Sequence, residues 1–418
     1  MEIATTCSPS LSWPDRCWRN LVLGRLAGLS RGALVIHDAG ERMTLGDPAA
    51  DLAATIEVHD RRFYRRVALG GDLGAAESLL DGDWSCDELP ALVRIFIRNL
   101  EATDRLAGWL NLLRQPALWW WRLRRRNTRR GAARNIHDHY DLGNDFFSLF
   151  LDDTLCYSCG IYADSQTSLR DASLAKLDRV CRQLDLRPTD HLLEIGSGWG
   201  GLAIHAAAHF GCRVTTATIS REQQKLATQR IRAAGLADKV EVVLSDYRDL
   251  TGQYDKLASI EMIEAVGHEN LPTFFRQCGR LLRPNGLMLL QAIVIQDQRY
   301  RRHIRGTDFI SRHVFPGGCL PSVEALVGAM ARGSDLAVRE LADFGPHYGE
   351  TLRRWRAAFH NRLAEVRSQG FDQRFIRLWD YYLAYCEAAF DERQVSVVQM
   401  RMARPERGEP MLISAGSR

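Results

Sequence analysis

The sequence has neither of the two features that mark secreted and membrane-spanning chains. The first seven residues read Met-Glu-Ile-Ala-Thr-Thr-Cys and lack the basic and apolar regions of a signal peptide. No run approaches the roughly 18 consecutive apolar residues that a membrane-spanning helix requires. We therefore expect a cytoplasmic protein without a transmembrane helix.

Cysteine pairs and excess charge are also scarce. Cys156 and Cys159 form the one Cys-x-x-Cys spacing among ten cysteines, whereas a zinc ribbon needs a second such pair. His137 and His139 have a His-x-His spacing but no third ligand nearby, so no metal site is predicted. A net charge of +4 over 418 residues gives no molecule-wide attraction for nucleic acid.

The chain length and a change in hydrophobic pattern indicate two domains. A single hydrophobic core stops growing at roughly 250–300 residues, and this chain has 418. Residues 1–115 alternate short strand-like runs, such as 33–37 and 54–59, with glycine-rich turns and then show a helical pattern near 89–100. We expect a small α/β domain at 1–115 and a larger domain at 135–418.

The segment 116–134 between these domains is basic and rich in tryptophan. Eight arginines, three tryptophans and no acidic residue occur within 114–134. The segment is interpreted either as a solvated linker or as a contact with an anionic membrane surface. At such a surface tryptophan prefers the headgroup level, and each basic residue contributes on the order of 1 kcal/mol. Nucleic acid is a third option, weakened because no recognition motif accompanies the segment.

From about residue 190 the sequence alternates strand and helix patterns. Strands are expected at 191–195, 213–217, 240–244, 256–260, 286–293, 336–341 and 394–402. Helices are expected at 220–234, 271–282, 348–368 and 374–392. This alternation predicts a Rossmann-like α/β fold, a mostly parallel sheet with helices on both faces. The late strand after two long helices suits a seven-stranded methyltransferase sheet with one reversed strand.

The first of these strands ends in a glycine-rich turn. Gly196, Gly198 and Gly201 satisfy the dinucleotide fingerprint. With Glu194 two residues before the first glycine, they equally satisfy the Asp/Glu-x-Gly-x-Gly pattern of S-adenosylmethionine (SAM) methyltransferases. The turn alone does not decide between these cofactors.

Two later positions bear on this choice: the first weakens a dinucleotide more than it proves SAM, since the usual methyltransferase acid is missing there too, and the second favours SAM. A dinucleotide fold wants an acidic residue about 20 residues past the glycines, but residues 215–220 read Thr-Thr-Ala-Thr-Ile-Ser. Asp246 and Tyr247 follow the third strand of the larger domain, where a polar residue beside an aromatic ring suits an adenine base.

Taken in order, the motifs of the chain resemble the cyclopropane fatty acid synthase family, which includes the mycolic acid cyclopropane synthases. The resemblance runs from about residue 135 to 402. It rests on the segments 135–146, 155–159, 193–201, 218–223, 261–267 and 315–322. The additional N-terminal domain looks like the phospholipid-modifying branch of the family.

The resemblance implies transfer of a methylene group from SAM to the cis double bond of an unsaturated phospholipid acyl chain, which forms a cyclopropane ring. It implies that bound bicarbonate deprotonates a carbocation and that helical elements within 135–418 bind the acyl chain. The expected partners are the phospholipid substrate and, through peripheral association, the membrane. No nucleic-acid partner is expected, and a homodimer is left open.

The resemblance also assigns site residues. For catalysis around the bicarbonate it assigns Cys159, Glu264, Gln291, Ile293 and Tyr348. Gln291 departs from the family, which has histidine there; glutamine donates a hydrogen bond to an anion but cannot become cationic. For SAM it assigns Tyr157, Ser158, Glu194, Gly196, Ser197, Gly198, Trp199, Gly200, Thr218, Ser220, Gln223, Asp246 and Tyr247.

Two other functions stay open at the level of sequence. A SAM-dependent enzyme of this kind can stop at a methyl- or methylidene-branched acyl chain if the cation loses a different proton or is reduced, and Gln291 keeps this alternative open. The other is a SAM-binding sensor with a silenced site. The presence of Glu264 and Tyr348 argues against a sensor.

Overall fold

The structure, a computed structural model, describes residues 12–100, 127–128, 131 and 142–405. The chain divides into two compact units that interleave along the sequence. Unit 1 comprises residues 1–126, 305–316 and 348–395, and unit 2 comprises residues 127–304, 317–347 and 396–418. The helices of 348–395 therefore group with the N-terminal residues, and the domain boundaries drawn from the sequence stay a prediction.

Two features singled out in the sequence fall largely outside the described residues. Of the basic segment 116–134, the structure describes Asn127, Thr128 and Gly131. His137 and His139 also lie outside the described residues. The interpretations of the basic segment therefore stay predictions.

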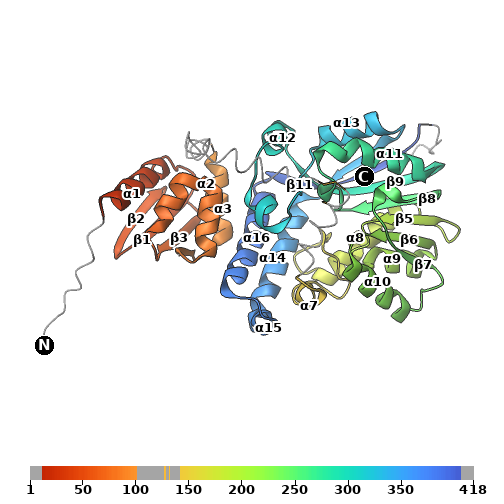
Figure 1. Ribbon diagram of the computed structural model, residues 1–418, viewed down its shortest axis with the longest axis horizontal. Coiled ribbons are helices and arrows are strands. Elements are labelled where there is room, and N and C mark those ends of the chain that lie inside the picture. Colours follow the sequence, from red (N-terminus) through yellow and green to blue (C-terminus); the bar gives the residue numbers. More distant parts are fainter. Residues whose placement is uncertain (1–11, 101–126, 129–130, 132–141, 406–418) are drawn as a thin grey trace, which may run out of the picture. The chain divides into compact units, whose positions relative to one another are not determined.

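The N-terminal part of unit 1 is a small α/β fold (Figure 1). Its elements are α1 (Trp13–Leu26), β1 (Ala33–Asp38), β2 (Glu41–Gly46), β3 (Ala53–Val58), α2 (Arg62–Leu80), β4 (Trp84–Cys86) and α3 (Leu89–Arg98). The four strands form a sheet of order β2-β1-β3-β4, in which β1 is parallel to β3 and antiparallel to β2. The strand-like runs and the helix expected in this region correspond to β1, β3 and α3.

Later in the chain, the described residues of unit 1 include three α-helices. They are α14 (Gly345–Asn361), which belongs to unit 1 from Tyr348 onward, α15 (Leu363–Ser368) and α16 (Gln373–Asp391). Just after α16, Glu392 accepts from Arg94 Nε at 2.8 Å and pairs with Arg98 Nη2 at 2.7 Å. These ion pairs join the end of α16 to α3, nearly 300 residues earlier in the chain.

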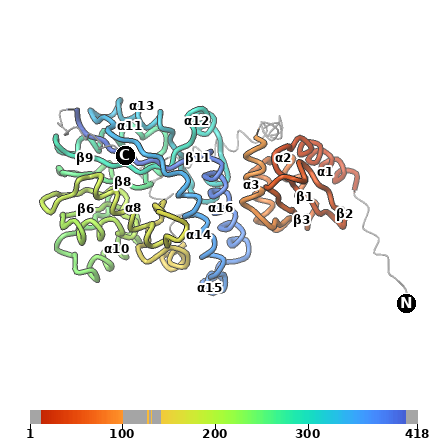
Figure 2. The backbone as a smooth tube through the Cα atoms, turned by 180° about the vertical axis from the view of Figure 1, so that it is seen from behind, coloured from red at the N-terminus to blue at the C-terminus, as the bar shows by residue number. Residues whose placement is uncertain are grey.

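Unit 2 is built on a seven-stranded sheet (Figures 1 and 2). Its strands are β5 (His191–Ile195), β6 (Arg213–Thr218), β7 (Val240–Leu244), β8 (Tyr254–Ile260), β9 (Leu282–Ile295), β10 (Ala337–Asp343) and β11 (Val395–Ala403). Their order is β10-β11-β9-β8-β5-β6-β7; β5 to β9 run parallel, and β10 is antiparallel to β11. The predicted mostly parallel sheet is confirmed.

Helices cover both faces of this sheet because successive strand residues point to opposite sides. Leu193 packs into a core with α11 (Leu271–Leu281) and α13 (Val323–Gly333). Its neighbour Leu192 packs into a second core with α8 (Leu169–Gln183), α9 (Gly201–His205) and α10 (Arg221–Ala233). Each fully buried leucine stabilises the fold by about 1.5–3 kcal/mol relative to an exposed one. The two cores explain why the strands read as continuous apolar runs.

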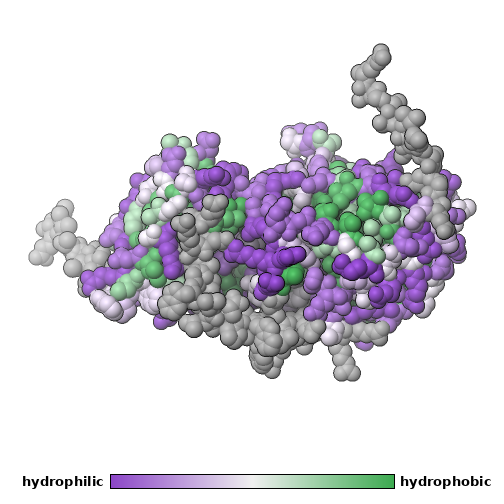
Figure 3. Space-filling model, turned by 90° about the horizontal axis from the view of Figure 1, so that it is seen from above, coloured by the Kyte–Doolittle hydropathy of each residue, from purple (hydrophilic) through white to green (hydrophobic). Residues whose placement is uncertain are grey.

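The surface over α13 carries exposed apolar side chains. Figure 3 looks onto the side where α13 lies in Figure 1 and shows an apolar patch of unit 2 within a mostly hydrophilic surface. Val327 of α13 is 37% exposed. Within the described ranges, no helix has both the length and the apolar character needed to cross a bilayer.

Candidate functional site

The candidate site lies at the carboxyl ends of the parallel strands of unit 2. The glycine turn follows β5, Thr218 ends β6, and Asp246 follows β7. Glu261 follows β8, and Gln291 lies on β9. Because the carboxyl ends of parallel strands meet at one edge of a sheet, these segments share that edge, where ligands bind in open α/β sheets.

The glycine turn places bare backbone at this edge. Gly196, Gly198 and Gly200 have φ of 99°, 48° and 85°, in the left-handed region that glycine adopts without a steric penalty. The N–H groups of Gly196 and Ser197 donate to the Ala217 carbonyl at 2.9 and 3.0 Å, which anchors the turn to β6. A Cβ added at Gly198 would meet no atom within 4 Å, so this backbone faces open space. The turn fits a cofactor lying against it.

Glu194 is a buried carboxylate directly before this turn. It is 3% exposed, and its Oε2 accepts a hydrogen bond from Thr216 Oγ1 at 2.6 Å. Burial raises the pKa of Glu194 to about 8, while the hydrogen bond from Thr216 and the charge of Lys176 oppose this rise. A cationic ligand group would favour the ionised carboxylate, so the site fits the ammonium group of SAM.

Lys176 of α8 is a polar residue of this region that the sequence motifs did not indicate. Its side chain is 2% exposed, and Nζ donates to Ser158 Oγ at 2.8 Å. The lysine thereby holds the hydroxyl of Ser158, one of the residues predicted to contact SAM. No spacing in the sequence connects a lysine inside a helical pattern to this loop.

Aromatic side chains pack beside the turn. The Trp199 ring lies 5.1 Å from Phe147, whose ring lies 5.2 Å from Tyr157. Trp199 Nε1 donates to Asn144 Oδ1 at 2.7 Å, and Trp199 is 2% exposed. Asn144 begins α7 (Asn144–Phe147), so the contact explains part of the motif at 135–146. Tyr157 is half-buried and remains the more accessible ring.

The polar residues predicted after β6 bind mainly to one another. Thr218 Oγ1 donates to Gln223 Oε1 at 2.8 Å. Ser220 caps α10, where its Oγ accepts from the Gln223 N–H at 3.3 Å. Their contacts to SAM stay predictions.

The residues predicted for adenine are engaged within the protein. Asp246 pairs with Arg248 at 2.6 Å. The Tyr247 ring packs 5.5 Å from Phe274, and burial raises the pKa of Tyr247 to about 12. The Tyr247 hydroxyl is buried and finds no hydrogen-bond partner among the described residues. An adenine contact by Asp246 and Tyr247 stays a prediction.

Four of the five predicted catalytic residues come together in unit 2 around two carboxylates. Glu261 Oε1 accepts from the Cys159 backbone N–H at 3.0 Å and from Gln291 Nε2 at 2.7 Å. Glu264 Oε1 accepts from the Ile293 backbone N–H at 2.6 Å. We call Cys159, Glu261, Glu264, Gln291 and Ile293 the carboxylate cluster.

A chain of hydrogen bonds orients Gln291 within the carboxylate cluster. Gln291 is 2% exposed, and its Oε1 accepts from Gln399 Nε2 at 2.9 Å. Gln399 Oε1 in turn accepts from Arg179 Nε at 3.1 Å. Since its oxygen is held by Gln399, Gln291 presents its NH₂ group to Glu261. Gln399 and Arg179 were missed by the motifs because they lie on β11 and α8, far away in sequence.

Glu264 is the carboxyl group of the cluster with the perturbed acidity. Burial, with a further contribution from the charge of Glu261, raises the pKa of Glu264 to about 8. Its Oε2 is shielded from solvent and has no hydrogen-bond partner within the described part of the chain. Glu264 is therefore suited to carry a proton near neutral pH.

The carboxylate cluster does not fit an additional bicarbonate. The Cys159 N–H and the Gln291 amide both donate to Glu261, and the Ile293 N–H donates to Glu264. A bicarbonate on these donors would have to displace carboxylates of the chain itself.

Tyr348, the fifth predicted catalytic residue, belongs to unit 1. It lies near the start of α14 and is 6% exposed. Its ring packs 4.4 Å from Phe390 and 6.1 Å from Trp355. Its catalytic role stays a prediction.

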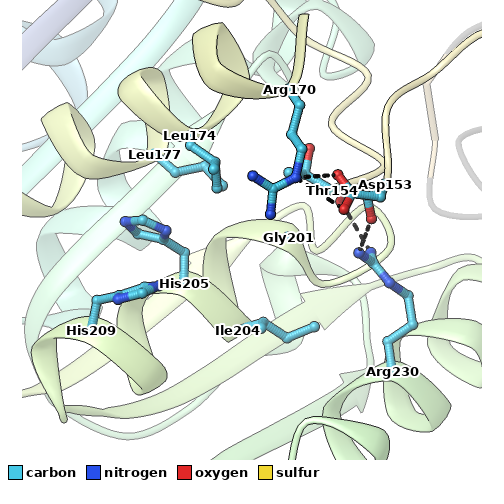
Figure 4. Close-up of a pocket in the computed structure, with 10 residues that line it drawn as sticks. All are labelled: Asp153, Thr154, Arg170, Leu174, Leu177, Gly201, Ile204, His205, His209 and Arg230. Atoms are coloured by element: carbon cyan, nitrogen blue, oxygen red, sulfur yellow. Dashed lines mark hydrogen bonds and ion pairs between the residues drawn. The ribbon is translucent and has the colours of Figure 1, made fainter. Parts of the chain in front are cut away.

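A separate pocket of unit 2 lies around α9 (Figure 4). It is lined by Asp153, Thr154, Arg170, Leu174, Leu177, Gly201, Ile204, His205, His209 and Arg230. Of these, only Gly201, the third glycine of the fingerprint, was singled out in the sequence. Arg170 pairs with Asp153 at 3.0 Å, and Arg230 donates to backbone carbonyls. No group of three metal-ligating side chains occurs among the described residues.

Comparisons with known sequences identify relatives of this chain. The family described as mycolic acid cyclopropane synthetase matches residues 127–400. The tuberculostearic acid methyltransferase of Mycobacterium tuberculosis is 39% identical over 348 residues, 81% of each chain. The cyclopropane-fatty-acyl-phospholipid synthase of Escherichia coli is 33% identical over 413 residues, 96% of this chain and 97% of that protein.

Solved structures agree with these matches. A cyclopropane synthase from Mycobacterium tuberculosis superposes with a TM-score of 0.61 at 28% identity and covers 65% of this chain and 98% of its own. A mycolic acid cyclopropane synthase complexed with SAH and CTAB gives a TM-score of 0.60 at 29% identity, over 65% of this chain and 97% of its own. The family match is consistent with the sheet order and with the glycine turn after β5. The chain therefore belongs to the cyclopropane synthase family of SAM-dependent methyltransferases.

Proposed function

We propose that this enzyme transfers a one-carbon unit from SAM to the cis double bond of an unsaturated acyl chain in a membrane phospholipid and forms a cyclopropane ring. The observation that carries the proposal is the carboxylate cluster at the same sheet edge as the glycine turn. The relatives add support: one is named a cyclopropane-fatty-acyl-phospholipid synthase and another a tuberculostearic acid methyltransferase.

The reaction sets two demands on the protein. When bound, SAM supplies an electrophilic methyl group on a sulfonium. A C–C bond to one alkene carbon forms as the S–CH₃ bond breaks, which leaves a neutral thioether and a carbocation on the acyl chain. An alkene is a weak nucleophile, so the step relies on alignment in a site that excludes water. The new methyl group must then lose a proton to a base, and its C–H electron pair closes the ring.

The residues of the two sites divide these tasks. Glu194, at the glycine turn, would hold the ammonium group of SAM and so fix the direction of the sulfonium. The half-buried Tyr157 ring would stabilise developing positive charge through its face. The carboxylate cluster would receive the proton. The resemblance implies bicarbonate here, but the donors of the carboxylate cluster already bind Glu261 and Glu264, so the proton would go to a carboxylate of the chain.

A methyl- or methylidene-branched product is the second candidate function. Gln291 replaces the histidine of the family, and a relative at 39% identity is named a tuberculostearic acid methyltransferase. If a hydride shift precedes proton loss from the new methyl group, an exocyclic double bond forms in place of the ring. Both routes need the same proton acceptor, so the carboxylate cluster serves either product.

Peripheral membrane contact is part of the proposal because the substrate lies in a bilayer. In unit 2, α12 (Asp297–His303) carries Arg301 and Arg302, both exposed. The sequence adds the arginines and tryptophans of 116–134, residues suited to an anionic interface. Co-sedimentation with vesicles should increase with anionic lipid and fall with salt. Binding indifferent to both would count against membrane contact.

The test of the proposed function is the mass of acyl chains from cells that lack such lipids. Cells expressing the wild type should gain one CH₂ unit on unsaturated chains, and cells expressing Glu264→Gln should not. Cyclopropane and methylidene products share one composition, so mild hydrogenation separates them: the methylidene takes up H₂ more readily. Unchanged acyl chains with the folded wild type would contradict the proposal and favour a SAM-binding sensor.

A further inference from the structure

We propose that the Glu261 carboxylate is the base that removes the proton from the new methyl group, in the place where the family resemblance expects bicarbonate. This assignment rests on the proposed function and names the proton acceptor within it. The sequence motif contained Glu261 but assigned it no role.

The hydrogen bonds of Glu261 carry the assignment. A backbone N–H and a side-chain NH₂ group converge on Glu261 Oε1, at 3.0 Å from Cys159 N and 2.7 Å from Gln291 Nε2. Two such donors form an anion-binding site, which we call the cradle. The group that occupies the cradle is the carboxylate of Glu261 itself. Glu261 is half-buried, whereas Cys159 and Gln291 are 1% and 2% exposed. Glu261 is therefore the most accessible of these three residues.

The backbone at Glu261 is held in a costly conformation that serves this arrangement. Its φ is 50°, in the left-handed region that residues with a Cβ rarely adopt. Such a conformation is unfavourable for a residue with a Cβ and persists where the surrounding structure fixes it. Here the Glu261 N–H donates to the Gln291 carbonyl at 2.8 Å, so the residue that orients the carboxylate also holds its backbone.

The second carboxyl group completes an acid and base pair. Glu264 is bound through Oε1 to the Ile293 N–H, and burial, with a further contribution from the charge of Glu261, raises its pKa. In the proposed pair the shared proton resides on Glu264, and Glu261, which accepts from Cys159 and Gln291, is the proton acceptor. In the step itself, one C–H bond of the new methyl group breaks, an O–H bond forms on Glu261, and the C–H electron pair closes the ring or forms the double bond.

The experiment measures methyl transfer to vesicles of unsaturated phospholipid in buffer depleted of CO₂, with and without added bicarbonate or formate. The variants are Glu261→Ala, which empties the cradle, and Glu261→Gln, which keeps it filled without a base. Glu324→Ala, which removes an exposed carboxylate of α13, is the matched control. Melting temperature and SAM affinity are recorded for each variant.

The wild type and Glu324→Ala should have equal rates with and without bicarbonate. Both Glu261 variants should lose about 10²–10⁴-fold in kcat while they still bind SAM, the range for removal of a general base. Bicarbonate or formate should restore activity to Glu261→Ala, saturably, but not to Glu261→Gln.

Two results would overturn the assignment alone: a wild type that is active only with bicarbonate, or a folded Glu261→Ala enzyme that is fully active without it. Absence of rescue in a folded Glu261→Ala enzyme that binds SAM would also count against it. A folded wild type that binds SAM but methylates no lipid would instead contradict the proposed function, and the base assignment with it.

Discussion

The glycine turn and the carboxylate cluster both place carboxyl groups at the carboxyl edge of one sheet, but they surround them differently. At the turn, Glu194 has a hydroxyl partner in Thr216 and a positive charge nearby in Lys176. In the cluster, Glu261 and Glu264 have amide donors and each other's charge. The first environment suits a carboxylate that awaits a cation. The second environment suits a pair of carboxyl groups, one of which holds a proton while the other accepts one from the substrate.

Replacement of the Glu264 carboxyl group by an amide tests the cluster half of this comparison. Glu264→Gln keeps the size of the side chain but cannot share a proton with Glu261. We expect kcat for methyl transfer to fall about 10²–10³-fold, within the range for acid and base groups, with SAM affinity little changed. Isothermal titration with SAM and a single-turnover assay measure the two effects separately. Full activity in this variant would remove Glu264 from the mechanism.

Removal of charge from Glu194 should give the opposite pattern. Glu194→Gln loses a charged partner for the ammonium group of SAM, and charge-assisted hydrogen bonds contribute about 1.5–3 kcal/mol. SAM affinity should therefore fall about 10–100-fold, while kcat at saturating SAM changes less. If Glu194→Gln and Glu264→Gln shift the same parameter, the proposed division between the two sites is wrong.

The pH dependence of stability should report both buried carboxyl groups. Glu194 and Glu264 have pKa values near 8 in the folded protein, against 4.5 as ordinary glutamates. Between these values the folded state binds more protons than the unfolded state, so stability falls as pH rises from about 5 to 8. Each group contributes a slope of at most about 1.4 kcal/mol per pH unit. Urea unfolding at several pH values should show a shallower slope in Glu264→Gln; an unchanged slope would mean that Glu264 does not hold this proton.

Gln291 should have a moderate effect because it orients a carboxylate and does not react. Gln291→Ala should lower turnover about 10-fold, the lower end of the effect of losing one hydrogen bond to a charged group, without abolishing it. Gln291→His restores a ring donor but loses the acceptor for Gln399, so its rate should differ from that of the wild type. Equal turnover in all three enzymes would show that this position is neutral.

Cys159 should show the smallest effect. Its contact with Glu261 uses the backbone N–H, and its thiol is bonded to the Gly160 carbonyl at 3.2 Å. Cys159→Ser keeps the backbone N–H and replaces the thiol by a hydroxyl that can also donate, so it should retain at least half of the activity. A large loss would point to a direct role for the thiol.

The sequence predicted the sheet of unit 2 well because central strands such as β5 are buried on both faces and read as apolar runs. The expected strands at 191–195 and 240–244 coincide with β5 and β7. In unit 1, β2 was missed because Glu41–Gly46 mixes charged and apolar residues at an exposed edge. The grouping of residues 348–395 with the N-terminal part was also missed, since it depends on contacts between distant segments.

The site was predicted less completely than the fold. Motifs identified Glu194, the glycines and Glu264 because each has a fixed offset from a strand end. They gave no role to Glu261, because the sequence of the motif does not show which hydrogen-bond donors a second acidic residue contacts in the fold. The Gln399 bond to Gln291 spans 108 residues and exists because β11 lies beside β9 in the sheet. Such contacts depend on the order of the strands in the sheet, and no short segment of the sequence shows that order.

The most direct test of the proposed function uses purified enzyme, SAM labelled in its methyl group, and vesicles of a phospholipid with one cis double bond per chain. We predict that the wild type places the label in the acyl chain as one added CH₂ unit and that Glu264→Gln does not. Wild-type enzyme that is folded and binds SAM, yet leaves the acyl chains unlabelled, would contradict the proposed function.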